Sequence, residues 1–326
     1  MAETHNPDAP RPVARALPPP SKAGDTAFRW LTWTMAMVVV GLIALVGWKL
    51  FQGSHLSLHK FGGRFLVRSD WDPVNESFGA LPFIFGTFVS SFIGLLIALP
   101  LSVGTAVYLT ELAPLWLRQP VIMVIEMLAA IPSVILGFWG STVMVPWLRD
   151  HPFPILKKLF GSTPLFQGPI YGVSMLAAGV ILAIMILPII TSVSREILRS
   201  VPDLQREAAY ALGATRWEVT RLAVLSYAKR GICGAAILGL GRALGETMAV
   251  TMVIGNRPEI AASLFAPGYT LASAIANEFT EATTDIYLSA LFELGLVLLI
   301  VTVVTNILAQ VLIGAFGAVT LSPARP

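Results

Sequence analysis

The sequence predicts an all-α integral membrane protein with six transmembrane helices. Three observations support this fold class: hydrophobic residues make up 55% of the 326 residues, charged residues make up 13%, and the mean hydropathy is +0.74. Soluble globular chains carry about 25% charged residues, so the composition excludes a soluble enzyme of this length. Open β-strands are excluded as well, because lipid cannot satisfy their backbone hydrogen-bonding groups.

Six windows are long and apolar enough to cross a bilayer, which takes about 20 mostly apolar residues. They cover residues 31–51, 82–110, 120–148, 169–194, 231–256 and 286–317. Several windows exceed the minimum, which predicts tilted or kinked helices. Kinks are expected at Pro100, at Pro188, and at Pro132 with its neighbour Ser133. Such kinks are ordinary in membrane helices, but they also help a gate to hinge.

The segments outside the windows have distinct characters. Residues 1–25 contain six prolines in the first twenty positions and no apolar periodicity, which predicts a disordered tail, and residues 26–326 are expected to form one transmembrane domain. Window 31–51 is expected to remain as an anchor, because its polar lead is long and no small-x-small cleavage site follows it. Residues 151–168 combine apolar side chains with two lysines, which predicts a short helix in the outer interface.

The distribution of lysine and arginine favours cytoplasmic N- and C-termini. In that orientation thirteen basic residues lie inside and seven lie outside. The segment 195–230 contributes seven of the thirteen, so it decides the orientation. The loop 52–81 is then expected to face outward.

Signals for cofactor binding are missing from the sequence. The dipeptide Gly-Lys never occurs, so there is no nucleotide-binding G-x-x-x-x-G-K-[ST] loop. Cys233 is the one cysteine, which excludes an intramolecular disulfide and a cysteine zinc site, and its apolar neighbours predict a buried, inert thiol. His55 and His59 are four residues apart without a third ligand nearby, so we expect no metal site. The net charge of +3 is too weak to indicate a nucleic-acid-binding protein.

The segment 195–230 predicts two helices joined by a tight turn. Pro202 suits a first helical turn, where a missing N–H is harmless. Gly213 suits the left-handed residue that ends this helix, and Thr215 with Glu218 forms a capping box that begins a second helix. Because small alanines are exposed on this hairpin, the segment is either a solvated hairpin or a docking element that enters a partner's groove.

Three motifs carry a resemblance to a known family. The stretch E-A-A-x-x-x-G at residues 207–213 resembles the coupling motif of ABC importer permeases. The stretches I-P-S-V-I-L-G-F-W-G at 131–140 and G-L-G-R-A-L-G-E-T-M-A-V at 239–250 are similar to the C-type permease subunits of Pst phosphate importers. The similarity covers roughly residues 30–316. Ser226 is a departure, because the family usually has proline at this point after the coupling motif.

The resemblance implies a type I ABC importer permease fold in the cytoplasmic (inner) membrane. It implies that coupling to a partner ATPase depends on Glu207, Ala208, Ala209 and Gly213. The implied partners are a second, similar permease chain, a dimer of ATPase subunits that binds ATP and Mg²⁺, and an extracytoplasmic phosphate-binding protein. The substrate is then inorganic phosphate. The chain itself is expected to be a non-catalytic subunit with no cofactor of its own.

Arg242 and Glu246 lie near the middle of window 231–256, where an ionised side chain costs about 2.5–3.5 kcal/mol on insertion scales. Their spacing of four places them on one helical face, where they can form an ion pair. Gly241 and Gly245 allow close helix approach on an adjoining face. Two interpretations stay open: a structural ion pair, or a polar translocation path in which the guanidinium holds phosphate and the carboxylate keeps binding transient. The resemblance implies the path.

Three other polar residues inside the windows, Glu126, Glu293 and Asn306, are expected to be partners in helix–helix contacts.

The function that the resemblance implies is a permease subunit of an ATP-driven phosphate importer that forms half of the translocation pathway. A permease for another oxyanion, such as molybdate or sulfate, is the alternative within this class. An ion-gradient-driven transporter is the alternative from a different class. It would usually show internal repeats with broken helices in matching positions, and the sequence shows no repeat.

Overall fold

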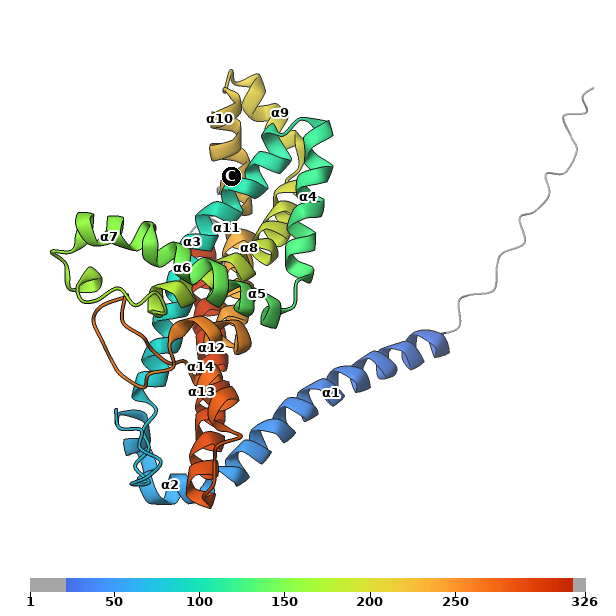
Figure 1. Ribbon diagram of the computed structural model, residues 1–326. Helices are drawn as coiled ribbons and strands as arrows, with labels where there is room; N and C mark the ends of the chain where they lie inside the picture. Colours follow the sequence, from blue (N-terminus) through green and yellow to red (C-terminus); the bar gives the residue numbers. More distant parts are fainter. Residues whose placement is uncertain (1–21, 319–326) are drawn as a thin grey trace, which may run out of the picture. The chain divides into compact units, whose positions relative to one another are not determined.

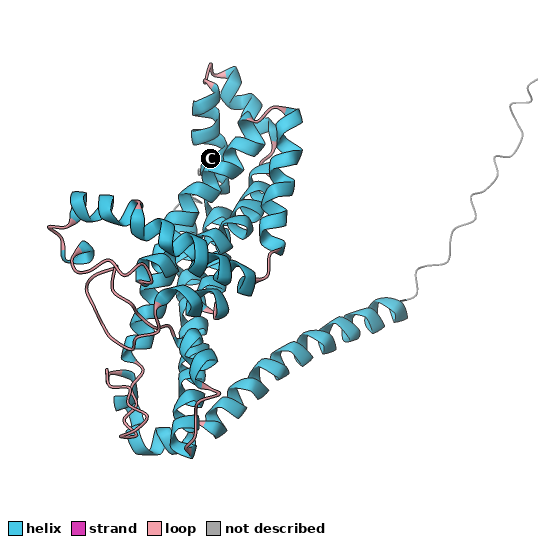
Figure 2. Ribbon diagram, viewed as in Figure 1, coloured by secondary structure: helices cyan, strands magenta, loops and turns pink. Residues whose placement is uncertain are grey.

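The computed structural model describes residues 22–318, which contain helices and loops with one isolated β-bridge. Figure 2 shows the predominance of helix over this part of the chain. The chain divides into two units, residues 1–48 and 49–326. The helix α1 (Lys22–Gly53) begins inside the predicted tail, so residues 22–25 are helical, contrary to that prediction. The rest of the predicted tail lies outside the described residues.

Five helices among residues 22–318 are long and apolar enough to cross a membrane. They cover Gly24–Gly53, Leu81–Leu112, Met175–Arg199, Arg216–Leu244 and Asp285–Val311. A sixth candidate is a bent pair of helices, Leu115–Ala130 and Ser133–Asp150, whose two parts meet at 94°. The prediction of six spans is therefore confirmed where the bent pair counts as one span, and each predicted window overlaps one of these segments.

The predicted kink at Pro132 is a complete break between α4 (Leu115–Ala130) and α5 (Ser133–Trp139). Proline lacks a backbone N–H and disfavours a helical conformation in the residue before it, and Ile131 has extended torsions of φ −68° and ψ 125°. Pro100 and Pro188 act differently, because α3 (Leu81–Val107) and α8 (Met175–Arg199) continue past them.

The predicted span 231–256 is wrong as a single helix. It consists of the end of α11 (Leu225–Leu244) and all of α12 (Met248–Ile254), with a break at residues 245–247. Gly245 favours the break because glycine is a poor helix former. The carboxylate of Glu246 then accepts the backbone N–H of Ala249 at 3.4 Å, so it satisfies one of the free donors at the start of α12.

The remaining elements have the following bounds: α2 (His55–Phe61), η1 (Gly62–Leu66), η2 (Tyr108–Leu112), η3 (Gly140–Met144), α6 (Val145–Asp150), α7 (Pro152–Phe160), η4 (Pro164–Phe166), α9 (Asp203–Ala211), α10 (Arg216–Glu218), η5 (Val219–Val224), α13 (Leu271–Glu278) and α14 (Asp285–Ala318). The elements η2, η3 and η5 are short π-helical turns. The helix α7 confirms the short helix predicted within residues 151–168. The helix α13, which begins at a capping box of Thr270 and Ser273, was not predicted.

The most buried span is α8, and it packs between α3 and α11. Glycines allow these helices to approach closely. A Cβ atom on Gly94 of α3 would lie 2.9 Å from the Cβ atom of Leu182, and one on Gly239 of α11 would lie 2.7 Å from Ile190. The hydroxyl of Ser102 also donates to the carbonyl of Leu187 at 3.1 Å. The three helices therefore form the rigid centre of residues 49–318.

Within residues 49–318, the hairpin α9–α10 and the segment formed by α2 and the following loop lie at opposite ends of the helix bundle (Figure 1). The loop is fixed by Trp71, whose indole N–H donates to the carboxylate of Glu278. Tyr287 donates to the same carboxylate at 2.7 Å. This separation is consistent with opposite sides of a membrane for segments 195–230 and 52–81.

Candidate functional site

The hairpin at residues 203–218 has the predicted local structure. Pro202 precedes α9, and Gly213 has the left-handed torsion φ +82°. Thr215 Oγ1 accepts the N–H of Glu218, and the Glu218 carboxylate accepts the N–H of Thr215 at 2.8 Å, which completes the capping box. The turn is therefore built by local hydrogen bonds and one glycine.

The four residues predicted to couple the chain to an ATPase lie together on this hairpin. Glu207, Ala208 and Gly213 are exposed, and Ala209 is half-buried. Apolar side chains beside them are exposed too, and Leu212 reaches 90%. An exposed apolar tip of this kind is typical of a docking surface. The coupling role of these residues stays a prediction.

The exit from the hairpin is continuous with the following span. The π-turn η5 leads directly into α11, and Ser226 lies in the first turn of that helix. Its hydroxyl donates to the carbonyl of Arg221 at 3.3 Å. Serine at this position therefore permits an unbroken helical exit.

The ion pair between Arg242 and Glu246 is present, with Nη2 and Oε2 separated by 3.5 Å. The two side chains differ in exposure: Arg242 is 51% exposed and Glu246 is 4% exposed. The prediction that both lie on one continuous helical face is wrong, because α11 ends at Leu244. Glu246 is held in the break between the helices, whereas Arg242 projects from the last turn of α11. The guanidinium is therefore exposed on the surface of this chain, whereas the carboxylate is buried.

The depth of Arg242 in the membrane follows from the helix length. Lys229 and Arg230 are the last basic residues on α11 before Arg242. Twelve residues of α-helix rise about 18 Å, a little more than half of a 30 Å hydrocarbon core. With Arg230 at a boundary of the hydrocarbon core, Arg242 and the helix break lie near the middle of the bilayer.

The two broken spans meet beside Arg242. A pocket of about 40 Å³ is lined by Arg242, by Leu128, Ala129 and Ile131 at the end of α4, by Leu136 of α5, and by Met185 and Ile189 of α8. The Pro132 break therefore borders the arginine, with Ser133 as the first residue of α5. Pro100 and Pro188 do not line this pocket. None of the four residues predicted for a gate or kink lines this pocket, but Pro132 and Ser133 lie between two residues that do, Ile131 and Leu136.

The second halves of the two broken spans are in close contact. A Cβ atom on Gly137 of α5 would lie 2.9 Å from the Cα atom of Ala249 and 2.8 Å from Met252 Sδ of α12. Gly241 faces Asn306 of α14, but without the predicted close approach: a Cβ atom there would lie 3.7 Å from the amide oxygen of Asn306, an ordinary contact distance. Gly245 has no such contact outside its own helix and serves to end α11 instead.

Replacing Gly137 with alanine is expected to lower the unfolding free energy by about 1–3 kcal/mol, because added volume in a tight contact forces shifts of the backbone. The control is Gly104→Ala, since no atom lies within 4 Å of a Cβ added at Gly104. Thermal unfolding of the purified proteins in detergent measures the difference. Equal melting temperatures for the two variants would show that the contact between α5 and α12 is loose.

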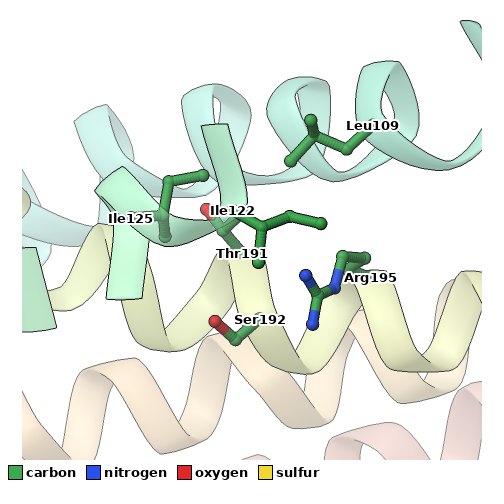
Figure 3. Close-up of a pocket in the computed structure, with 6 residues that line it drawn as sticks. All are labelled: Leu109, Ile122, Ile125, Thr191, Ser192 and Arg195. Atoms are coloured by element: carbon green, nitrogen blue, oxygen red, sulfur yellow. The ribbon is translucent and has the colours of Figure 1, made fainter. Parts of the chain in front are cut away.

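A second arginine lies in a crevice between helices near the hairpin end of the bundle. Figure 3 shows Arg195 and Ser192 of α8 with Thr191, facing Ile122 and Ile125 of α4 and Leu109 of η2. Arg195 pairs with the neighbouring carboxylate of Glu196 at 3.1 Å. The crevice and the pocket at Arg242 are both lined by residues of α8. The crevice is closed in this structure, so no open passage joins the two.

The remaining intramembrane acids have contrasting environments. Glu126 is exposed on α4, and Glu293 of α14 is 3% exposed. Arg206 and Glu111, which no motif in the sequence marks, form an ion pair of 3.0 Å at the base of the hairpin. The two residues are 95 positions apart, and no spacing pattern in a single sequence joins them.

Comparison with known proteins gives matches over most of the chain. Residues 98–317 match the family model described as "Binding-protein-dependent transport system inner membrane component". The chain is 47% identical to the phosphate transport system permease protein PstC of Mesorhizobium japonicum, over 91% of this chain and 92% of that protein. It is 50% identical to the PstC protein of Pasteurella multocida, over 89% and 91% of the two chains.

A solved structure supports the same fold. A crystal structure of a bacterial alginate ABC transporter, in complex with an alginate-bound periplasmic protein, aligns with a TM-score of 0.58 and 14% identity. The alignment covers 88% of this chain and 94% of the other. At this identity the likeness shows the fold alone.

Proposed function

Since the chain belongs to the binding-protein-dependent inner membrane transport components, and within them to the PstC phosphate permeases, we propose that it is a permease subunit of an ATP-driven inorganic phosphate importer. It is a multi-pass protein of the inner membrane and a non-catalytic component. ATP is hydrolysed by a separate subunit, which holds ATP and Mg²⁺.

The Arg242–Glu246 pair, which lies in a helix break, is the observation that supports phosphate as the substrate. Broken helices near the bilayer centre are typical places for substrate sites, because they bring polar groups to a water-filled path. A guanidinium offers paired donors that match phosphate oxygens. The buried carboxylate of Glu246 competes for the same donors, so phosphate bound at Arg242 is released again.

The partners follow from the same family membership. The importer includes an ATPase, which we place at the α9–α10 hairpin, and an extracytoplasmic binding protein, which we place at the opposite end of the bundle. A second, similar permease chain completes the pathway, because the helices of one chain enclose only part of it. The half-exposed Arg242 is the feature that this second chain would cover.

Two alternatives are distinguished by transport assays. Broken helices also occur in ion-gradient-driven transporters, and family membership argues against that class. The test uses the complete complex in proteoliposomes, with phosphate uptake measured after addition of ATP and with the proton gradient collapsed. Uptake that requires ATP and survives the collapse supports the importer. Uptake without ATP, or stronger uptake of molybdate or sulfate than of phosphate, would contradict the proposal.

The orientation is tested by cysteine labelling. The native Cys233 is exposed, contrary to the prediction of a buried thiol, because apolar neighbours in a membrane helix do not require burial within the chain. In a Cys233→Ala background, Leu212→Cys is expected to resist a membrane-impermeant thiol reagent in intact cells. Val74→Cys, which is 91% exposed in the loop at the other end, is expected to react. The opposite pattern would reverse the topology.

A further inference from the structure

One arginine at the base of the hairpin joins two chain segments, residues 198–206 and the turn that contains Glu111, through four hydrogen bonds. Arg206 Nη2 donates to Glu111 Oε1 and to the carbonyl of Leu198, both at 3.0 Å. Its Nη1 donates to the carbonyl of Val201 at 2.6 Å and to the Asp203 carboxylate at 3.1 Å. Of these four partners, Glu111 belongs to a distant segment, the π-turn η2 that follows α3.

The ion pair between Arg206 and Glu111 is shielded from solvent. The side chain of Arg206 is 18% exposed and that of Glu111 is 14% exposed. A pair in this environment is screened much less by salt than a surface pair, and removal of one partner leaves the other charge uncompensated. Removing one partner is therefore expected to cost more here than in an exposed ion pair such as Lys60 with Glu76.

The pair lies where three spans converge. Beside it is an apolar cluster formed by Ala106 of α3, by Leu198 and Val201 at the end of α8, and by Val224 and Ala228 at the start of α11. The polypeptide links the hairpin covalently to α8 and to α11. The helix α3 has no such link, and Glu111 provides a charged contact between its end and α9.

We propose that Glu111 and Arg206 are positioning residues that transmit movement of the docking hairpin to α3. A displaced α9 carries Arg206 with it, and the ion pair draws η2 and the end of α3 in the same direction. The π-turn is a suitable place for this, because π-helical turns concentrate where helices must adjust. Since α3 packs tightly on α8, whose face borders Arg242, the movement reaches the charged site. This inference rests on the proposed function.

The experiment measures phosphate transported per ATP hydrolysed by the complete complex in proteoliposomes. In Glu111→Gln the ratio is expected to fall about tenfold, within the range that loss of a coupling contact produces, while ATP hydrolysis continues. Loss of folded complex would lower both rates together and leave the ratio unchanged. The control is Asp150→Asn, which breaks an ion pair of 2.8 Å between exposed side chains, Arg149 and Asp150, and should keep the wild-type ratio.

A second variant separates transmission from folding. Glu111→Leu with Arg206→Met removes both charges of the shielded pair. It leaves only Asp203 without its partner, and that carboxylate is 88% exposed to solvent, so the complex is expected to assemble, with the ratio still low. A wild-type ratio in either Glu111→Gln or the double variant overturns the proposal. So does failure of the double variant to assemble, because the pair would then be a folding element. If the wild-type complex itself does not transport phosphate, the proposed function fails instead.

Discussion

Replacing Arg242 with glutamine is expected to abolish phosphate uptake while leaving the complex assembled. The variant removes the guanidinium that is 51% exposed beside the helix break, and it leaves the buried carboxylate of Glu246 to repel an anion. The start of α12 should persist, because Glu246 still accepts the N–H of Ala249. Uptake of labelled phosphate by cells is the measurement, with the amount of assembled complex determined in parallel.

The control for this variant is Arg149→Gln. Arg149 also pairs with a carboxylate, Asp150, at 2.8 Å, but it lies on the surface away from the breaks. Its replacement should leave uptake unchanged. The single variant Glu246→Gln should behave differently from both: its amide oxygen can keep the contact with Ala249, but Arg242 loses its competitor and releases phosphate more slowly.

The double variant Arg242→Gln with Glu246→Gln decides between the two interpretations of the pair. A purely structural pair predicts recovery, since no buried charge remains unpaired in the double variant. A translocation path predicts that uptake stays absent in an assembled complex, because the anion has lost its donors. Uptake close to that of the wild type would leave the pair as scaffolding and contradict the path.

The hairpin could be predicted from sequence because its signals are local. A capping box needs only Thr215 and Glu218 at the right spacing, and the end of α9 needs only Gly213. A kink at Pro132 could be predicted for the same reason, but the 94° angle between the two helices could not. A proline removes one hydrogen bond wherever it lies, but α3 and α8 continue past their prolines within the packed centre of the bundle, whereas α4 ends before Pro132.

The break at Gly245 does not appear in the hydropathy of residues 231–256, because hydropathy does not register helix ends. The signal was present in the sequence: a glycine followed by a glutamate that can reach the free N–H groups of a new helix. The Glu111–Arg206 pair had no comparable signal. A contact between two charges 95 residues apart depends on how α3 and α8 pack, and that arrangement exists only in the folded chain.

Replacing Gly213 with valine is expected to uncouple ATP hydrolysis from phosphate uptake. The residue has φ +82°, a conformation that costs an ordinary L-residue about 1–2 kcal/mol and is least accessible to a β-branched one. A Cβ atom here would meet no atom of this chain within 4 Å, so the effect acts through the backbone of the turn. Ala209→Trp should also uncouple, through bulk on the docking surface. Uptake and ATPase activity of the reconstituted complex are the measurements.

The control Gly213→Asn separates backbone conformation from bulk. Asparagine tolerates the left-handed region, so it should keep the turn and most of the coupling, even though its side chain is similar in size to that of valine. If asparagine and valine uncouple equally, the groove of the partner rejects any side chain at this position and the turn geometry is secondary. If Gly213→Val and Ala209→Trp both retain normal uptake with the ATPase bound, the hairpin is a solvated loop and the docking role is wrong. We expect valine to uncouple and asparagine to couple, because the torsion of Gly213 sets the angle at which α9 is presented to its partner.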